Sequence, residues 1–222
     1  MVKDGFTNEG TGIKNELPGD LTTYPKGNYN RFPSFVPSNG NIEQGYEKLA
    51  DRIIEKTKNG LRVLMIDGYH GIDWEEFQTE LDKCLNSNGA EPEWISINNC
   101  LADEDEIFNR IEKFLGNSDR IFGSHFPAGP EVFFDYKKLA DLRIEMAIRR
   151  GKKAGSLTIV YGTGAGLLEL WDELFYVDIA KDFIQEKFRE FKINNIGTSQ
   201  KTSFEEFYKR SYFVAVRGFV KH

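Results

Sequence analysis

The chain has 222 residues, of which 40% are hydrophobic and 29% charged, so it is long enough for one large domain with a full core. Its formal net charge of −6 and sequence pI near 5.3 argue against generic binding to nucleic acid or to an acidic membrane surface, since both need a basic footprint. The two cysteines, Cys84 and Cys100, have no paired spacing of the kind that indicates zinc or a disulfide framework. We therefore expect ordinary reduced thiols and no metal site.

The N-terminal part differs in composition from the rest of the chain. Residues 1–41 are rich in Gly, Pro, Asn and Thr and predict an irregular arm, which is followed by one domain over 42–222. The arm has neither the basic start nor the apolar centre of a signal peptide, and no apolar run is long enough to span a membrane. We expect a cytoplasmic protein.

Strands and helices alternate through the predicted domain. Apolar residues recur at helical spacing from Ile42 to Ile54, and Gly60 ends this helix. The run 62–66 is almost entirely apolar, as expected of a strand buried on both faces of a parallel sheet. Asp73 is predicted to cap the next helix, with Glu76 as its capping-box partner. Further along, the pattern predicts strands at 93–97, 156–161 and 174–177, helices at 103–115, 135–150 and 180–191, and a loop with a short strand at 120–134. This alternation specifies an α/β fold with a mainly parallel sheet.

The segment 61–81, LRVLMIDGYHGIDWEEFQTEL, has the outline of a phosphate-binding loop between a strand and a helix. Such a loop normally reads G-x-x-x-x-G-K-[ST], in which lysine reaches the outer phosphates and the hydroxyl holds magnesium. Here Asp73, Trp74 and Glu75 stand where a cation and a hydroxyl are needed. The motif is therefore a degenerate Walker A sequence.

Several pieces of the chain, in this order, resemble the uridine-kinase-like branch of the P-loop kinases. The resemblance covers about 60–212 and rests on VLMIDGYHGIDWEEF, FPAGPEVFFDYKKL, SLTIVYGTGAGL, LFYVDIAKDFIQEKFREF and NNIGTSQKTSFEEFYKRSY. It implies a three-layer P-loop-kinase-like α/β domain, with a lid-like segment near 192–203. It also implies ATP and Mg²⁺ as cofactors if the domain is active.

A narrower resemblance is to the kinase-like domains that precede the cupin domain in some longer bacterial class I mannose-6-phosphate isomerases. The phrases RFPSFVP, VYGTGAGLL and YVDIAKDFIQEKFR carry it. In such proteins the isomerase activity and the metal belong to the cupin domain. No cupin domain is present here, so isomerase activity is not expected of this chain alone.

The candidate residues each have a plain structural alternative. Asp67, His70 and Asp135 are candidate catalytic bases, although a lone histidine in a glycine turn and an aspartate at a helix start commonly have structural roles. Candidate ligand contacts fall in the turn after the first strand, in the loop GSHFP, in the glycine turn GTGAG and in the lid-like region: Gly68, His70, Gly71, Asp73, Arg120, Ser124, His125, Gly162, Gly164 and Arg189. The glycines also suit a tight strand-to-helix turn, and the basic residues also suit solvated ion pairs.

Three functional readings follow. The first is a catalytically altered kinase-like module that binds a small phosphorylated or sugar ligand, or an isomerase partner domain, in carbohydrate metabolism. The second is an ATP-dependent phosphotransferase acting on a nucleoside or sugar. The third is a purely structural module that docks on a cupin-type isomerase domain or forms an oligomer, which the apolar run SYFVAVRGFV near the C-terminus favours.

Overall fold

A computed structural model describes residues 42–116, 119, 121–151, 157–199 and 202–215. The chain divides into two units, Met1–Ile42 and Glu43–His222, and every helix and strand described below belongs to the second. The predicted arm at 1–41 and the second half of the apolar run SYFVAVRGFV lie outside the described residues. No helix in the described ranges is long and apolar enough to cross a membrane.

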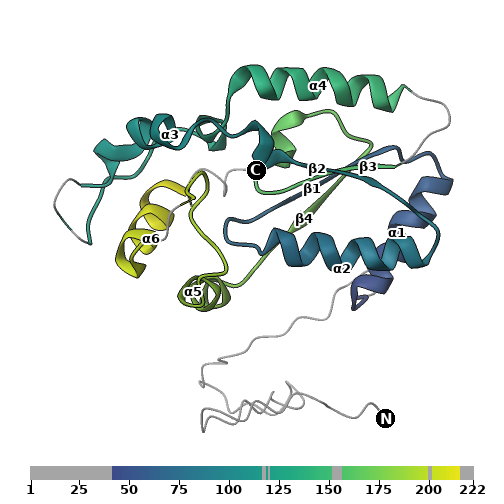
Figure 1. Cartoon of the computed structure of the whole chain (residues 1–222), viewed down its shortest axis with the longest axis horizontal. Helices are drawn as coiled ribbons and strands as arrows, with labels where there is room; N and C mark the ends of the chain where they lie inside the picture. Colours follow the sequence, from purple (N-terminus) through teal and green to yellow (C-terminus); the bar gives the residue numbers. More distant parts are fainter. Residues whose placement is uncertain (1–41, 117–118, 120, 152–156, 200–201, 216–222) are drawn as a thin grey trace, which may run out of the picture. The chain divides into compact units, whose positions relative to one another are not determined.

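The centre of the domain is a four-stranded parallel sheet with the order β2-β3-β1-β4 (Figure 1). The strands are β1 (Val63–Gly68), β2 (Glu93–Ser96), β3 (Thr158–Tyr161) and β4 (Glu173–Val177). β1 lies between β3 and β4, with Val63 opposite Thr158 and Leu64 opposite Glu173. The predicted parallel sheet is confirmed, and β1 is one of its two inner strands, covered by a neighbouring strand on each side and by a helical layer on each face.

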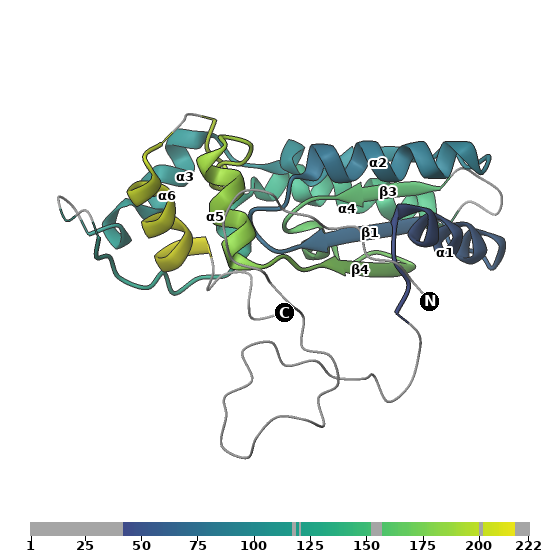
Figure 2. The same cartoon turned by 90° about the horizontal axis from the view of Figure 1, so that it is seen from below.

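Helices cover both faces of the sheet, which makes three layers (Figures 1 and 2). Because side chains alternate along a strand, Leu64 and Ile66 pack with α1 (Tyr46–Lys58) and α2 (Trp74–Ser87) on one face. Val63 and Met65 pack on the other face with α4 (Tyr136–Arg150) and the 3₁₀ helix η5 (Ala165–Leu168). The α/β three-layer prediction is therefore confirmed.

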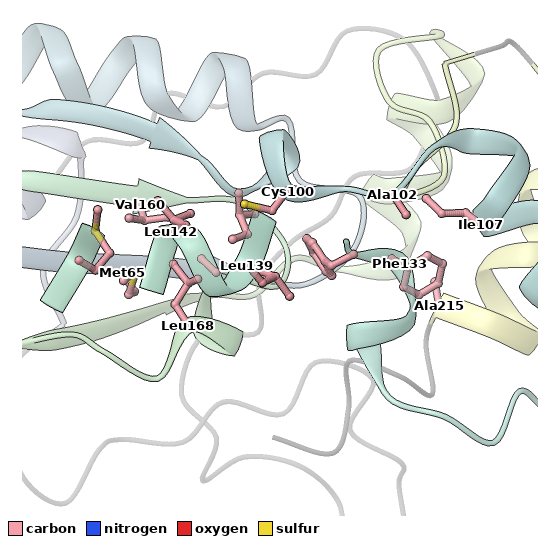
Figure 3. Packing of buried hydrophobic residues seen from close by; sticks show 14 of the residues in the cluster. Met65, Cys100, Ala102, Ile107, Phe133, Leu139, Leu142, Val160, Leu168 and Ala215 are labelled. Atoms are coloured by element: carbon pink, nitrogen blue, oxygen red, sulfur yellow. The ribbon is translucent and has the colours of Figure 1, made fainter. Parts of the chain in front are cut away.

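A helical region lies beyond the carboxyl ends of the strands (Figure 2). It contains α3 (Glu104–Ile111), α5 (Lys181–Arg189), α6 (Phe204–Arg210) and the π-helical turn η6 (Ser211–Ala215). The core on the α4 side continues into it without a break: Figure 3 shows Met65 and Val160 near α4 at one end of the packed cluster and Ile107 and Ala215 at the other. A separate cluster joins α5 to α6 through Ile184, Phe188 and Phe207. This region closes over the carboxyl edge of the sheet.

The remaining short helices connect the larger elements. They are η2 (Ile97–Cys100) after β2, η3 (Glu112–Phe114) after α3, and η4 (Pro130–Phe133) before α4.

Helix ends follow local side-chain chemistry at several positions. Asp73 accepts a hydrogen bond from the amide of Glu76 at 3.1 Å and caps α2, as predicted. Asp135 accepts hydrogen bonds from the amides of Lys137 and Lys138 and caps α4. Such caps satisfy amides that have no partner within the helix.

The structure corrects three predicted boundaries. The first helix starts at Tyr46, because Gly45 adopts a φ of 98° that breaks the helical path, and Ile42 is 83% exposed before it. β2 ends at Ser96, because the Ser96 side chain accepts a hydrogen bond from the amide of Asn98 and starts η2. In the described part of 120–134 the predicted short strand is replaced by η4, which begins at Pro130 and is followed by one bridge between Phe134 and Leu101.

Candidate functional site

The sheet has a switch point between β1 and β3. β1 leads into α2 on one face, whereas β3 leads into η5 on the opposite face. Adjacent strands whose connections leave to opposite sides open a crevice at their carboxyl ends, and ligands of open α/β sheets bind there. The two segments that flank this crevice are the turn 69–73 and the turn 162–164.

The turn after β1 is filled by apolar side chains. A Cβ on Gly68 would lie 2.5 Å from Ile72 Cδ1 and 2.7 Å from the carbonyl oxygen of Val177. Gly71 has a φ of 100°, and a Cβ there would lie 2.7 Å from Ile184 Cγ2 of α5. The amide of Tyr69 donates to Val177 O at 2.9 Å. Both glycines are therefore explained by close packing, and neither forms an open cradle of amides.

Asp67, a predicted catalytic candidate, organises the glycine turn after β3. Its Oδ1 accepts hydrogen bonds from the amides of Gly68 at 2.6 Å and Gly164 at 2.8 Å. Its Oδ2 accepts a hydrogen bond from the amide of Gly166 at 2.9 Å. A Cβ on Gly166 would lie 2.7 Å from that same oxygen. The carboxylate thus holds backbone donors, which is a structural task.

A cavity of about 600 Å³ opens at the crevice, and we call it the carboxyl-end pocket. Its wall comes from the turn 70–75, the segment after β2, Lys138 of α4, Thr163 and the segment 192–199. Two pairs of adjacent asparagines line the pocket. Asn98 and Asn99 follow β2, and Asn194 and Asn195 lie in the region predicted to be a lid.

The pocket carries more acidic than basic groups. Its carboxylates are Asp73, Glu75, Asp103 and Glu104, and its two ammonium groups belong to Lys138 and Lys192.

Both ammonium groups already have partners. Lys138 Nζ donates to the carbonyl oxygen of Leu101 at 3.0 Å, and Lys192 pairs with Glu190 at 2.9 Å. A polyphosphate would therefore meet a net negative wall.

His70 is a buried, neutral histidine at the pocket. Its side chain is 2% exposed, and burial lowers its pKa from 6.5 to about 4, helped by the positive charge of Arg210. Hydrogen bonding to Asn195 opposes this shift in pKa. In the geometry of the structure, however, neither His70 Nε2 nor Asn195 Oδ1 has a hydrogen-bond partner within the described part of the chain. Both residues line the pocket, and the two unpartnered atoms are themselves buried.

One lysine approaches the first turn of α2 from α5. Lys187 Nζ lies 3.0 Å from Glu76 Oε2 and 3.9 Å from Asp73 Oδ2. The Lys187 side chain is 13% exposed, and it lies outside the wall of the pocket.

The other candidates are distributed over several places. Gly162 and Gly164 flank Thr163, whose hydroxyl accepts a hydrogen bond from the Trp74 indole at 3.1 Å. Gly162 (φ 122°) packs against Ile97, and Gly164 (φ 99°) packs against Phe134.

Three more candidates lie away from the pocket wall. His125 packs between the rings of Tyr212 and Phe213, and the amide of its neighbour Ser124 bonds to Phe114 O. Arg189 lies over the ring of Phe204. Arg120 is outside the described residues.

Thus, of the predicted contacts, the structure brings His70, Gly71 and Asp73 together at the pocket. Sequence reasoning missed the asparagine pairs. The signal was present, because the same tripeptide, Ile-Asn-Asn, occurs at 97–99 and at 193–195. No group of three His, Cys, Asp or Glu side chains with metal-binding geometry occurs among the residues that the structure describes.

The family model for a domain of unknown function, DUF8485, matches residues 45–222. The chain belongs to the DUF8485 family. This match spans the whole sheet and the helical region beyond it. No curated protein matches the chain.

Among solved structures, this DUF8485 domain is similar to a protein of Silicibacter sp. TM1040 that is described as a "putative fructose transport system kinase". The TM-score is 0.52 at 12% sequence identity, over 80% of this chain and 94% of that one. At this identity the likeness shows the fold alone. The domain has a kinase-like α/β fold.

Proposed function

We propose that this domain binds a sugar or a related polyhydroxylated ligand in the carboxyl-end pocket, and that it does not transfer phosphate through the turn after β1. The observation that carries the proposal is the wall of the pocket, where two asparagine pairs and a neutral histidine meet at the switch point of a kinase-like sheet. This is the place where ligands of such sheets bind.

The chemistry of the wall suits hydroxyl groups. Each asparagine side chain supplies two N–H donors and one carbonyl acceptor, and a neutral imidazole supplies one donor and one acceptor. Carboxylates of Asp103 and Glu104 accept from hydroxyl groups as well. A pocket of about 600 Å³ falls within the range of small-molecule sites. A monosaccharide carries donors and acceptors on every side, and this wall can meet both kinds.

The same wall is poorly suited to ATP. Four carboxylates face two ammonium groups that already have partners, so a triphosphate would be repelled. The space beside Gly68 and Gly71 is taken by Ile72, Trp74 and Ile184, which leaves no concave nest of amides of the kind that binds phosphates. This is the physical basis for treating the Walker A sequence as degenerate.

The metabolic setting is carbohydrate chemistry, and two resemblances support it. The sequence is similar to kinase-like domains attached to mannose-6-phosphate isomerases, and the structural neighbour is described as a fructose transport system kinase. We propose hexoses and hexose phosphates as the first ligand class to test, and a cupin-type isomerase domain as a partner.

A second function, an ATP-dependent phosphotransferase acting on a sugar or nucleoside, is favoured by Lys187. Its ammonium group approaches the first turn of α2 from α5, and release from Glu76 would bring a cation to the start of the helix. In that reading Lys187 replaces the missing phosphate-loop lysine, and magnesium would be held by carboxylates of the turn.

Calorimetric titration separates the two functions. Mannose, fructose, their 6-phosphates and Mg²⁺–ATP are titrated into the full chain and into Asn98→Ala and Asn194→Ala. We expect hexose or hexose 6-phosphate binding that weakens about fivefold to tenfold in each asparagine variant, as for the loss of a ligand hydrogen bond. Asn86→Ala is the matched control, because Asn86 bonds to Asp82 on the exposed side of α2 and does not line the pocket.

The opposite result has a clear form. Micromolar binding of Mg²⁺–ATP that survives both asparagine substitutions and disappears in Lys187→Met would overturn the proposal and establish the phosphotransferase. Phosphorylation of a hexose by the wild-type chain, detected by ³¹P NMR, would identify the phosphate acceptor.

A further inference from the structure

A second cavity, of about 660 Å³, lies between α3 and α6, and we call it the α3–α6 cavity. It shares Glu104, Asn195 and Thr198 with the carboxyl-end pocket, so one wall separates the two. None of the residues predicted from the sequence to contact a ligand lines it. Its chemistry therefore needs an explanation of its own.

The cavity contains the partly buried guanidinium of Arg210, which forms no ion pair with a carboxylate among the described residues. Arg210 donates from Nη2 to the carbonyl oxygen of Ile196 at 2.8 Å, and its Nε has no hydrogen-bond partner in the described ranges. Burial lowers the pKa of Arg210 to about 10, and the charge of Glu104 opposes this only in part. Glu104 is itself engaged, since its Oε2 accepts from the hydroxyl of Ser199 at 2.6 Å. A partly desolvated cation that donates to one carbonyl oxygen is costly unless an anion joins it.

Two further groups point to the same kind of ligand. The hydroxyl oxygen of Thr198 is buried and has no partner among the described residues. Lys209 also lines the cavity at 7% exposure, and its ammonium group donates to the carbonyl oxygen of Asp119. The cavity also carries Glu112 and Glu206, but both are exposed. Of the three carboxylates that line the cavity, Glu104 is thus the partly buried one and already bonds to Ser199, while Arg210, Lys209 and Thr198 supply donors.

We propose that the α3–α6 cavity is a binding site for a phosphate group, either inorganic phosphate or the phosphate of a small monoester, with Arg210 and Thr198 as its principal donors. A tetrahedral oxyanion offers several acceptors in different directions, which matches an N–H and an O–H from different elements, with Lys209 nearby. The planar fork of arginine suits bidentate contact with phosphate. This site goes beyond the proposed function, because it does not depend on what occupies the carboxyl-end pocket.

Histidine NMR of the full chain gives a direct test with inorganic phosphate as the probe. The chain has three histidines, and Arg210 is close enough to His70 for its charge to lower the pKa of that imidazole. Phosphate bound at Arg210 is expected to shift the His70 ring signals in a saturable way, while chloride at the same ionic strength does not. Calorimetry supplies the affinity.

Three substitutions localise the binding. Arg210→Gln is expected to weaken phosphate binding at least about tenfold, and Thr198→Val about threefold to tenfold, as for the loss of one charge-assisted and one ordinary hydrogen bond. Arg143→Gln is the matched control. Arg143 also donates to a carbonyl oxygen, that of Leu167, and also has a buried Nε without a partner in the described part of the chain, yet it lines neither cavity. It should bind phosphate as the wild type does.

The result that overturns the inference is the absence of saturable phosphate binding by the wild-type chain, or binding that is unchanged in both Arg210→Gln and Thr198→Val. If Arg210→Gln loses its native circular dichroism spectrum, phosphate binding by Thr198→Val and Arg210→Lys tests the inference instead. Neutral mannose is titrated in parallel, because it tests ligand binding in the carboxyl-end pocket. If mannose does not bind while phosphate does, the inference stands without the proposed function, and the reverse pattern removes the inference alone.

Discussion

Asp67 Oδ1 accepts a hydrogen bond from the amide of Gly164 at 2.8 Å, so the last acidic residue of β1 is fixed to the turn after β3. The same carboxylate also holds the amides of Gly68 and Gly166. In Asp67→Asn, the amide N–H₂ of the new side chain would replace one carboxylate oxygen and would face backbone donors with which it cannot form a hydrogen bond. We expect this variant to lower the free energy of unfolding by about 2–3 kcal/mol, as for lost hydrogen bonds to a charged acceptor, measured by urea denaturation.

Glu75→Gln is the control for the Asp67 experiment, because Glu75 is exposed at the start of α2 and should change stability by less than about 0.5 kcal/mol. An Asp67→Asn protein with wild-type stability would show that the carboxylate has no structural task. Its role as a catalytic base would then return to consideration.

Gly71→Ala is expected to be strongly destabilising, because the backbone φ of 100° is strained for alanine and the new methyl group would lie 2.7 Å from Ile184 Cγ2. The two effects together should lower the unfolding free energy by about 2–4 kcal/mol. Gly89→Ala separates them. Its φ of 76° is also positive, but nothing lies within 4 Å of the added Cβ, so it should cost only about 1 kcal/mol.

The contact with Ile184 can be checked by a double-mutant cycle. Gly71→Ala combined with Ile184→Ala should cost at least about 1 kcal/mol less than the sum of the single changes, since the clash is removed. Simple additivity would place the strain in the backbone alone.

His70 gives the stability a dependence on pH. Its pKa of about 4 in the folded protein lies below the ordinary value of 6.5, so the unfolded chain binds more protons between these values. Stability must therefore fall as the pH drops from about 6.5 towards 4. Between pH 7.5 and pH 5 this group alone should remove about 2 kcal/mol, which urea denaturation of wild type and His70→Gln at both pH values can measure.

Burial is the main cause of the low pKa of His70; the charge of Arg210 lowers the pKa further, and Asn195 raises it. The His70→Gln protein should lose about 2 kcal/mol less than the wild type over the same interval. Equal pH dependence in the two proteins would contradict a buried neutral imidazole.

The indole of Trp74 and the hydroxyl of Thr163 join the start of α2 to the turn after β3. Trp74→Phe and Thr163→Val each remove this hydrogen bond, so a double-mutant cycle on stability should give a coupling energy of about 0.5–1.5 kcal/mol. Trp94→Phe with Thr163→Val serves as the unlinked pair, because Trp94 bonds to Asp82. Coupling near zero in the first cycle would show that the two turns are held independently.

The fold could be predicted because its signals are local. The apolar run of β1, the caps at Asp73 and Asp135, and the alternation of strands and helices can each be seen within a few residues of sequence. The first helix was placed too early because the left-handed backbone of Gly45 outweighs the apolar spacing that begins at Ile42. The backbone φ of a glycine cannot be read from the sequence, because glycine adopts positive and negative φ about equally readily.

The candidate site was only partly predictable, because it is assembled from distant segments. His70 and Asp73 were found from the turn that contains them. That Asn98 and Asn194 line one pocket follows only from the order of the strands, which the sequence does not give. Asp135 could be a base or a helix cap, and its amide partners in the structure identify it as a cap. Two of the three amide partners of Asp67, Gly164 and Gly166, lie beyond β3, so its task could not be deduced from the first turn.

The central place of β1 has a consequence for synthesis of the protein. Its two neighbours are encoded far downstream, at Thr158–Tyr161 and Glu173–Val177. At roughly 5–20 residues per second of translation, an emerging chain therefore carries the apolar β1 without either neighbouring strand for several seconds. Early in this interval only α1 and α2 can shield it, on one face, and chaperone binding to the nascent chain should be strongest there.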